Sequence, residues 1–268
     1  MMRQLGRVLV AYSGGVDSAY LAMIANEEVG DDAVCIMGLS PSVSEFQRTE
    51  AERIAKQLGL NFETIDTNEI DDPRYAANPA NRCFYCKDEL YSRLSEVARS
   101  RGIGWVLDGT NADDLADVRP GREAAKIRGV RSPLAELGFS KKEIRVQSGS
   151  AGLYGFDRPA SPCLSSRIAH GVPVTIERLG RVEKAEAYLR AEGFREFRVR
   201  VHGELARVEV AVNELPRALE PATASKIGAE LREVGFKFVT LDLEGFRSGS
   251  LNKREADIRL QNTTLEIT

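Results

Sequence analysis

The chain has 268 residues, a net charge of −3 and a hydrophobic share of 43%, which fits one large globular domain or two modest ones. No uninterrupted apolar run reaches the roughly 20 residues of a membrane span, and no signal peptide precedes the first predicted strand, so we expect a cytoplasmic protein without a membrane partner. The slightly acidic balance also argues against a nucleic-acid partner, which a dense Lys/Arg patch would favour.

The first part of the chain alternates predicted strands and helices. Apolar runs predict strands over residues 8–11, 33–39, 61–66, 103–108 and 130–134. Helices are predicted from residue 19, from a capping box at Ser44 and Gln47 to near Gly59, over 83–99, and from a capping box at Ser140 and Glu143 to 148. A polar loop is predicted over 69–82. Repeated βα units imply a mostly parallel sheet covered by helices on both faces.

The pattern changes in the second part of the chain. Residues 153–173 carry prolines and no periodicity, and so long a loop in a compact protein is usually either functional or disordered. A helix over 175–192, a hairpin of strands 197–201 and 205–212, a helix over 222–234 and a strand over 236–241 follow. We therefore predict two domains, a parallel α/β domain over 1–172 and a smaller α+β domain over 173–268.

A glycine-rich turn joins the first predicted strand to the first long helix. Strand, glycine turn and helix start is an arrangement that binds anions, because backbone N–H groups and hydroxyls point at the ligand. Asp17 would repel phosphate unless a Mg²⁺ ion lies between them or the residue serves the helix start. The residues predicted to bind ATP here are Ala11, Ser13, Gly14, Gly15, Val16, Asp17 and Ser18.

Two further polar segments follow predicted strands. Ligands of parallel sheets bind at the carboxyl ends of strands, which places Ser40, Gly109 and Asn111 beside the glycine-rich turn. Gly109 would allow close approach of a nucleotide. In the alternative interpretation, Asn111 and Asp113 merely cap the next helix.

Three of the four cysteines form a candidate reactive group. Cys83 and Cys86 make a C-x-x-C pair, which alone fits a zinc half-site, a redox pair or part of an iron–sulfur cluster. Cys163, in the Pro-rich loop, is the candidate third ligand of a [4Fe–4S] cluster, whose fourth iron would stay open. Cys35 lies in an apolar strand and is predicted to be a buried small hydrophobe.

Arginines supply a second candidate anion site. Arg198 and Arg200 alternate along a predicted strand, so both face the same side. Two guanidinium groups on one face suit a phosphate or a carboxylate, although an exposed charged sheet face has the same pattern. Arg167, four residues after Cys163, is a further candidate.

These segments together resemble a known family. Residues 13–18, Ser-Gly-Gly-Val-Asp-Ser, resemble the PP-loop of the ATP pyrophosphatase superfamily, whose fold is of the adenine nucleotide alpha hydrolase-like type. With residues 81–87, 109–121, 131–134, 159–167, 198–203 and 241–252, nearly the whole chain resembles the LarE family. LarE enzymes are ATP-dependent sulfur transferases in biosynthesis of the nickel-pincer nucleotide cofactor.

The resemblance implies a reaction and its cofactors. ATP, with Mg²⁺, adenylylates a carboxylate of pyridinium-3,5-biscarboxylic acid mononucleotide, and sulfur then displaces AMP to leave a thiocarboxylate. One branch of the family sacrifices a cysteine, which here would be Cys163, and forms dehydroalanine. Another holds a [4Fe–4S] cluster on three cysteines, and Cys83, Cys86 and Cys163 match that branch.

The resemblance also implies partners. Sulfide or a sulfur-donor system is then a partner. Arg198, Arg200 and Arg167 would bind the substrate phosphate, and the family forms homo-oligomers, often hexameric.

Other functions share parts of this pattern. A PP-loop tRNA thiolase can also use a C-x-x-C with a third cysteine, but its polyanionic substrate fits poorly with a net charge of −3. An ammonia-dependent ligase of the NAD or GMP synthetase type would need no cysteines near the site, and an ATP-binding module would need no acceptor.

Overall fold

The computed structural model describes residues 1–116, 120–159 and 161–247. The chain divides into two compact units, Met1–Cys163 and a second that begins at Leu164. The domain boundary predicted between residues 172 and 173 lies inside this second unit. In the described residues, no helix combines the length and the apolar character that crossing a membrane requires.

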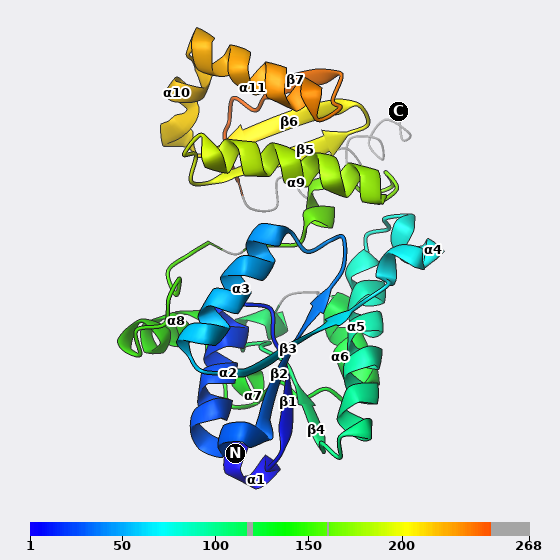
Figure 1. The fold of residues 1–268 in the computed structure, drawn as a ribbon, viewed down its shortest axis with the longest axis vertical. Coiled ribbons are helices and arrows are strands. Elements are labelled where there is room, and N and C mark those ends of the chain that lie inside the picture. The colour runs from blue at the N-terminus through cyan, green and yellow to red at the C-terminus, as the bar shows by residue number, and fades with distance from the viewer. Residues whose placement is uncertain (117–119, 160, 248–268) are drawn as a thin grey trace, which may run out of the picture. The chain divides into compact units, whose positions relative to one another are not determined.

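A four-stranded parallel sheet forms the centre of the first unit (Figure 1). Its strand order is β3 (Asn61–Asp66), β2 (Ala33–Leu39), β1 (Val8–Ala11) and β4 (Trp105–Leu107). All three strand pairs are parallel. The two central strands are the most apolar, because helices cover both faces of the sheet. The parallel sheet predicted from the βα repeats is confirmed.

Alternate residues of each central strand contact different helices. Val8 and Val10 of β1 pack with α2 (Val16–Val29), α3 (Glu45–Gln57) and α8 (Lys141–Ser150). Leu9, between them, packs on the opposite face with α5 (Arg82–Ser100) and α6 (Pro120–Ile127). This alternation follows from the two-residue period of a strand.

Local sequence signals set most element boundaries. Both predicted capping boxes are present, Ser44 with Gln47 at the start of α3 and Ser140 with Glu143 at the start of α8. The polar loop predicted over 69–82 contains a 3-10 turn, η2 (Glu69–Asp71), and a short helix, α4 (Pro73–Ala76). Helix α1 (Met2–Leu5) precedes β1.

The fifth strand predicted over 130–134 is wrong. Only Arg131 makes a bridge to the sheet, with Leu107, and a short helix, α7 (Pro133–Glu136), follows at once. Pro133 has no N–H to donate to a strand ladder, but its fixed φ suits the first turn of a helix. The segment therefore leaves the sheet after one residue.

The second unit is a smaller mixed sheet with helices. Its strand order is β5 (Phe197–His202), β6 (Leu205–Val210) and β7 (Phe238–Leu241), with β5 and β6 antiparallel and β6 and β7 parallel. Helices α9 (Ile176–Ala191), α10 (Leu215–Leu219) and α11 (Pro221–Glu233) complete it. The fold class, a parallel α/β sheet followed by a small mixed sheet, is as predicted.

The segment after Cys163 belongs to this second unit. A short 3-10 turn, η4 (Leu164–Arg167), leads into Ile168, which bridges to Val201 of β5. Leu164, Ile168 and Val201 are all buried. The apolar contacts of this segment explain why the unit begins at Leu164.

Candidate functional site

The loop between β1 and α2 is held by its own serines. Ser13 Oγ and Ser18 Oγ lie 3.0 Å apart, Ser18 Oγ donates to the Gly15 carbonyl at 3.0 Å, and the Ser13 N–H donates to Ser18 Oγ at 3.1 Å. Gly14 has φ +72°, and a Cβ there would lie 2.6 Å from Ala51 Cβ of α3. Only glycine meets both conditions, so the loop conformation is built into these residue types.

Asp17, in the first turn of α2, is only half satisfied. Its Oδ2 forms an ion pair with Lys141 Nζ, while its Oδ1 is buried without a hydrogen-bond partner. Lys141 begins α8, and its backbone N–H donates to Asp113 Oδ2 at 2.8 Å. A buried carboxylate oxygen without a donor fits a divalent cation. Sequence reasoning missed Lys141, although the Ser140 capping box already fixed where its helix begins.

Gly109 is close to protein backbone. A Cβ at this position would lie 2.7 Å from the Ser18 nitrogen and 3.0 Å from the Asp17 carbonyl carbon. The glycine therefore allows the loop after β4 to pack against the start of α2. The contact that demands glycine here is with the first turn of α2, and a role of Gly109 in binding a nucleotide stays a prediction.

Asn111 fits both of its interpretations. It is fully buried, and its Oδ1 accepts from the Asp114 N–H at 3.1 Å, as a cap of the 3-10 turn η3 (Asp113–Ala116) should. Its Nδ2 is buried without a partner. The unsatisfied donor of Asn111 follows β4 and the unsatisfied acceptor of Asp17 lies in the first turn of α2, which follows β1. Both are therefore at the same edge of the sheet, which is where a polar ligand would bind.

Ser40 is committed to a structural contact. Its Oγ donates to Glu69 Oε1 at 2.6 Å, and the buried Glu69 also accepts from Thr67 Oγ1 at 2.9 Å. Ser40 thereby ties the end of β2 to η2.

The three cysteines predicted to hold a cluster lie on two segments of the first unit. Cys83 and Cys86 are in the first turns of α5, and Cys163 ends the unit. Burial raises the pKa of the Cys86 thiol, and the charges of Glu69, Cys163 and Cys83 raise it further. Even so, no three His, Cys, Asp or Glu side chains in the described part of the chain are grouped as metal ligands.

Cys35 is set apart from those three. It is fully buried in β2, and burial raises its pKa to about 12. None of the four cysteines forms a disulfide. Cys35 is therefore an apolar core residue, as predicted.

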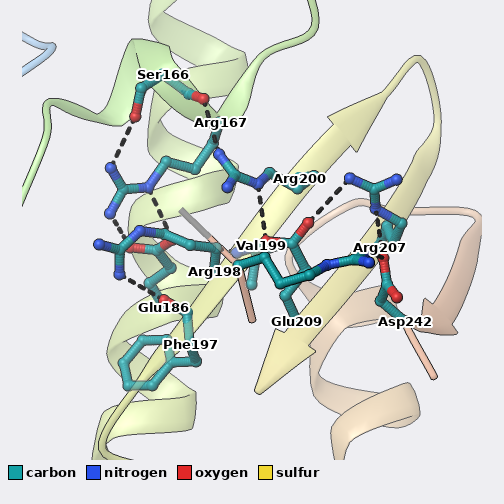
Figure 2. A network of polar contacts seen from close by, with 11 residues as sticks. Ser166, Arg167, Glu186, Phe197, Arg198, Val199, Arg200, Arg207, Glu209 and Asp242 are labelled. Atoms are coloured by element: carbon teal, nitrogen blue, oxygen red, sulfur yellow. Dashed lines mark hydrogen bonds and ion pairs between the residues drawn. The ribbon is translucent and has the colours of Figure 1, made fainter. Parts of the chain in front are cut away.

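The second unit gathers all three predicted arginines into one network (Figure 2). Arg167 forms a bidentate ion pair with Glu186 of α9, at 2.9 and 3.0 Å. Arg200 donates to Glu209 Oε2 at 3.1 Å and to the Ser166 carbonyl at 3.0 Å. Burial, together with the charge of Arg167, lowers the pKa of Arg198 to about 10.

Two residues of β6 complete this network. Arg200 lies opposite Arg207, and Arg198 lies opposite Glu209, so all four side chains start from one face of the sheet. Arg207 donates to Glu209 Oε1 at 2.9 Å and lies 3.6 Å from Asp242. Arg167, Arg200 and Arg207 form ion pairs with the carboxylates of Glu186, Glu209 and Asp242. Arg198 starts from the same sheet face as Arg200, so these four arginines outnumber the three carboxylates. The network is chemically suited to an anion. Sequence reasoning missed Glu186, Arg207 and Glu209, although the last two alternate along β6 as Arg198 and Arg200 do along β5.

Comparison with known proteins places the chain in a family. The family model described as NAD synthase matches residues 2–98, which contain the β1–α2 loop. An uncharacterized protein of Synechocystis is 45% identical over 93% of each chain. The pyridinium-3,5-bisthiocarboxylic acid mononucleotide synthase of Lactiplantibacillus plantarum is 34% identical over 94% of this chain and 91% of its own. An uncharacterized protein of Methanocaldococcus jannaschii is 30% identical over 90% of this chain and 91% of its own. With its PP-loop geometry and these relatives of matching length, the chain belongs to the LarE family of ATP pyrophosphatase enzymes.

Proposed function

We propose that this protein is an ATP-dependent sulfur transferase that converts the carboxylates of pyridinium-3,5-biscarboxylic acid mononucleotide to thiocarboxylates. The observation that carries this proposal is the edge of the sheet where Asp17 Oδ1 and Asn111 Nδ2 are buried without partners beside the serine-braced loop. The relative whose name describes this synthase aligns with 94% of the chain, so its activity is the natural candidate.

In this proposal the β1–α2 loop binds the phosphates of ATP. The N–H group of Gly14 and the start of α2 offer donors and a positive helix end. The buried Oδ1 of Asp17 fits a Mg²⁺ ion, which when bound would offset the charge between carboxylate and phosphates. Lys141, already paired with Asp17, adds a cation at the same place.

The chemistry begins with activation of a carboxylate. A substrate carboxylate oxygen attacks the α-phosphorus of ATP, the bond from that phosphorus to the bridging oxygen breaks, and pyrophosphate leaves. The product is an acyl adenylate, whose carbonyl carbon a sulfur nucleophile can attack with AMP as leaving group. The protein contributes position and charge, which supply most of the rate in phosphate chemistry.

We assign the substrate phosphate to the arginine network. Arg198 and Arg200 come from one strand face, and Arg167 adds a third guanidinium whose ion pair with Glu186 fixes its orientation. Buried carboxylates hold these side chains in place before a ligand arrives, which reduces the entropy lost on binding.

Sulfur delivery is proposed to use Cys83, Cys86 and Cys163. Three free thiols are the donor type that holds a [4Fe–4S] cluster, and such a cluster, when bound, would supply transferable sulfide. Because the three side chains are not grouped as metal ligands, the segments of Cys163 and α5 would have to approach each other. The alternative is a sacrificial Cys163: its Sγ attacks the acyl adenylate and expels AMP, then loss of its Hα breaks the Cβ–Sγ bond and leaves dehydroalanine.

The test is product analysis with the mononucleotide and Mg·ATP under anaerobic conditions. We expect AMP, pyrophosphate and thiocarboxylate in equal amounts per carboxylate converted. If pyrophosphate release does not depend on the mononucleotide, the proposed substrate is wrong. Intact mass after turnover, with iron and sulfide analysis, separates the two sulfur sources. Dehydroalanine at position 163 in protein without bound iron would overturn the cluster and leave the sulfur transferase standing.

A further inference from the structure

Helix α3 contacts the nucleotide loop with one side and holds the segment before Cys163 with another. Toward the loop, the Tyr12 hydroxyl donates to the Ala51 carbonyl at 3.0 Å, and Ala51 occupies the space that a side chain on Gly14 would need. Toward the other segment, α3 presents Gln47, Glu50, Arg53 and Gln57. Spacings of three, three and four residues place these side chains on a single helix face.

The segment that α3 holds consists of residues 152–159 and 161–163, which we call the cysteine strap. It runs antiparallel to the helix. Gln57 Nε2 donates to the Gly152 carbonyl at 2.9 Å near one end, and Gln47 Nε2 donates to the Ser161 carbonyl at 2.7 Å near the other. Ser161 is two residues from Cys163. Because Gln47 Oε1 also accepts from the Ser44 N–H of the capping box, the start of α3 and the end of the strap are fixed by one side chain.

Between these ends lies a clasp made of Tyr154, Arg53, Arg158 and Glu50. The guanidinium of Arg53 lies 3.8 Å from the centre of the Tyr154 ring, and that of Arg158 lies 4.4 Å from it. Both arginines donate to the Tyr154 hydroxyl, Arg53 at 2.6 Å, and Arg158 also pairs with Glu50. Cation–π contacts and ion pairs at such partly exposed positions are individually weak. The clasp therefore fastens the strap through several weak contacts acting together.

We propose that α3 is the spacer that sets the position of Cys163 relative to the nucleotide loop, and that the clasp residues are positioning residues for sulfur transfer. This inference rests on the proposed function. Helix α3 contacts Gly14 on one side and the strap on another. It therefore fixes the position of the strap relative to the loop that binds ATP. Opening the clasp would leave adenylylation intact and misplace the sulfur-bearing residue.

The first experiment measures the two half-reactions in the same mixture. Tyr154→Ala and Arg53→Ala are expected to keep pyrophosphate release within about twofold of the parent. Thiocarboxylate formed per pyrophosphate should fall roughly five- to hundredfold, since displacements near 1 Å can cost that much in a positioned reaction. Tyr154→Phe keeps the ring contacts and loses the hydroxyl. Its yield of thiocarboxylate per pyrophosphate should therefore lie between those of the parent and Tyr154→Ala. The matched control is Arg48→Ala, which removes an exposed pair with Glu52 on the same helix at 2.8 Å and should leave the ratio unchanged.

The second experiment does not depend on the chemistry. Amide hydrogen exchange in a peptide over residues 152–159 should speed up in Tyr154→Ala and Arg53→Ala and not in Arg48→Ala. Unchanged exchange would show that the clasp does not fasten the strap. Faster exchange with an unchanged product ratio would show that the strap does not position sulfur. If the parent itself releases no pyrophosphate with the mononucleotide, the proposed function fails, and the exchange measurement still decides whether α3 fastens the strap.

Discussion

The two candidate anion sites hold their ligand groups in different ways. The β1–α2 loop relies on backbone conformation, two serine hydroxyls and one carboxylate with an unsatisfied oxygen. The arginine network relies on charges buried against opposite charges, with Arg200 and Arg167 at most 6% exposed and Glu209 fully buried. A loop of the first kind can lose a side chain without unfolding, because the backbone keeps its shape. A network of the second kind loses folding stability with each charge removed, because a buried partner is left behind.

The largest effect that separates the two sites is expected at Glu209. Glu209→Ala leaves Arg200 and Arg207 without their shared carboxylate, and breaking a buried pair in this way typically costs about 3–5 kcal/mol of folding stability. Urea unfolding of variant and parent measures it. Glu204→Ala, which removes an exposed pair with Lys237, is the control and should change stability by less than about 1 kcal/mol. If Glu209→Ala proved as stable as Glu204→Ala, the arginines of the network would not depend on the shared carboxylate of Glu209.

Asp17 is expected to show the opposite behaviour. Asp17→Ala should lower pyrophosphate release by about 10²–10³-fold, because the carboxylate that would hold Mg²⁺ beside the phosphates is lost. Its unfolding curve should stay close to that of the parent, since Lys141 remains 37% exposed to solvent when its partner is removed and Asp17 Oδ1 has no hydrogen bond to lose. Asp31→Ala, an exposed acid elsewhere in the same unit, is the control for both measurements. Undiminished ATP turnover in Asp17→Ala would remove this loop from the reaction.

Arg200→Ala should weaken the binding of one of the two substrates, in addition to the loss of folding stability expected for a member of the network. Arg200→Ala removes a charge-assisted hydrogen bond to the mononucleotide phosphate, which is worth roughly 1.5–3 kcal/mol, or about 10- to 150-fold in the dissociation constant. Calorimetric titration should show this loss for the mononucleotide and no change for ATP. Arg200→Lys should recover little, because an ammonium cannot keep the contact to Glu209 and grip a phosphate as a fork. Identical titration curves for the alanine variant and the parent would leave Arg200 a purely structural residue.

The same contrast explains what the sequence could predict. The β1–α2 loop and both capping boxes lie in contiguous residues, so local patterns were enough to place them. The network joins residues from 166 to 242, and alternation along β5 pointed to Arg198 and Arg200 without indicating that Glu186 and Glu209 would be their partners. Lys141 likewise reaches Asp17 across more than a hundred residues. Contacts of that range depend on the packed fold, which no local pattern encodes.

Two errors have local causes that were visible in the sequence. The strand predicted over 130–134 contained Pro133, which favours a helix start over a strand interior. The loop predicted over 69–82 contained Asp72 followed by Pro73, an N-cap and first-turn pair, and Asp72 does accept from the Arg74 N–H at 2.8 Å. Both predictions relied on whether the residues are apolar or polar, although the prolines, through their fixed φ, indicated the local structure more strongly.

The smallest expected effect tests whether burial or geometry gives an ion pair its strength. Arg101 and Glu63 make two hydrogen bonds of 2.7 Å, better geometry than the 3.1 Å of Arg200 and Glu209, yet both side chains are 38% exposed. The hydrogen bond from Arg101 lowers the pKa of Glu63 below its ordinary value. A lowered folded pKa means that the stabilisation is present above the unfolded pKa of about 4.3 and is lost as pH falls through the folded value. Solvent screening limits this stabilisation to about 1 kcal/mol or less.

The measurement is urea unfolding at two pH values. The stabilities of Glu63→Gln and the parent should therefore differ slightly at pH 7 and converge near pH 3. A cost as large as that of Glu209→Ala would mean that geometry, and not burial, sets the strength of these pairs.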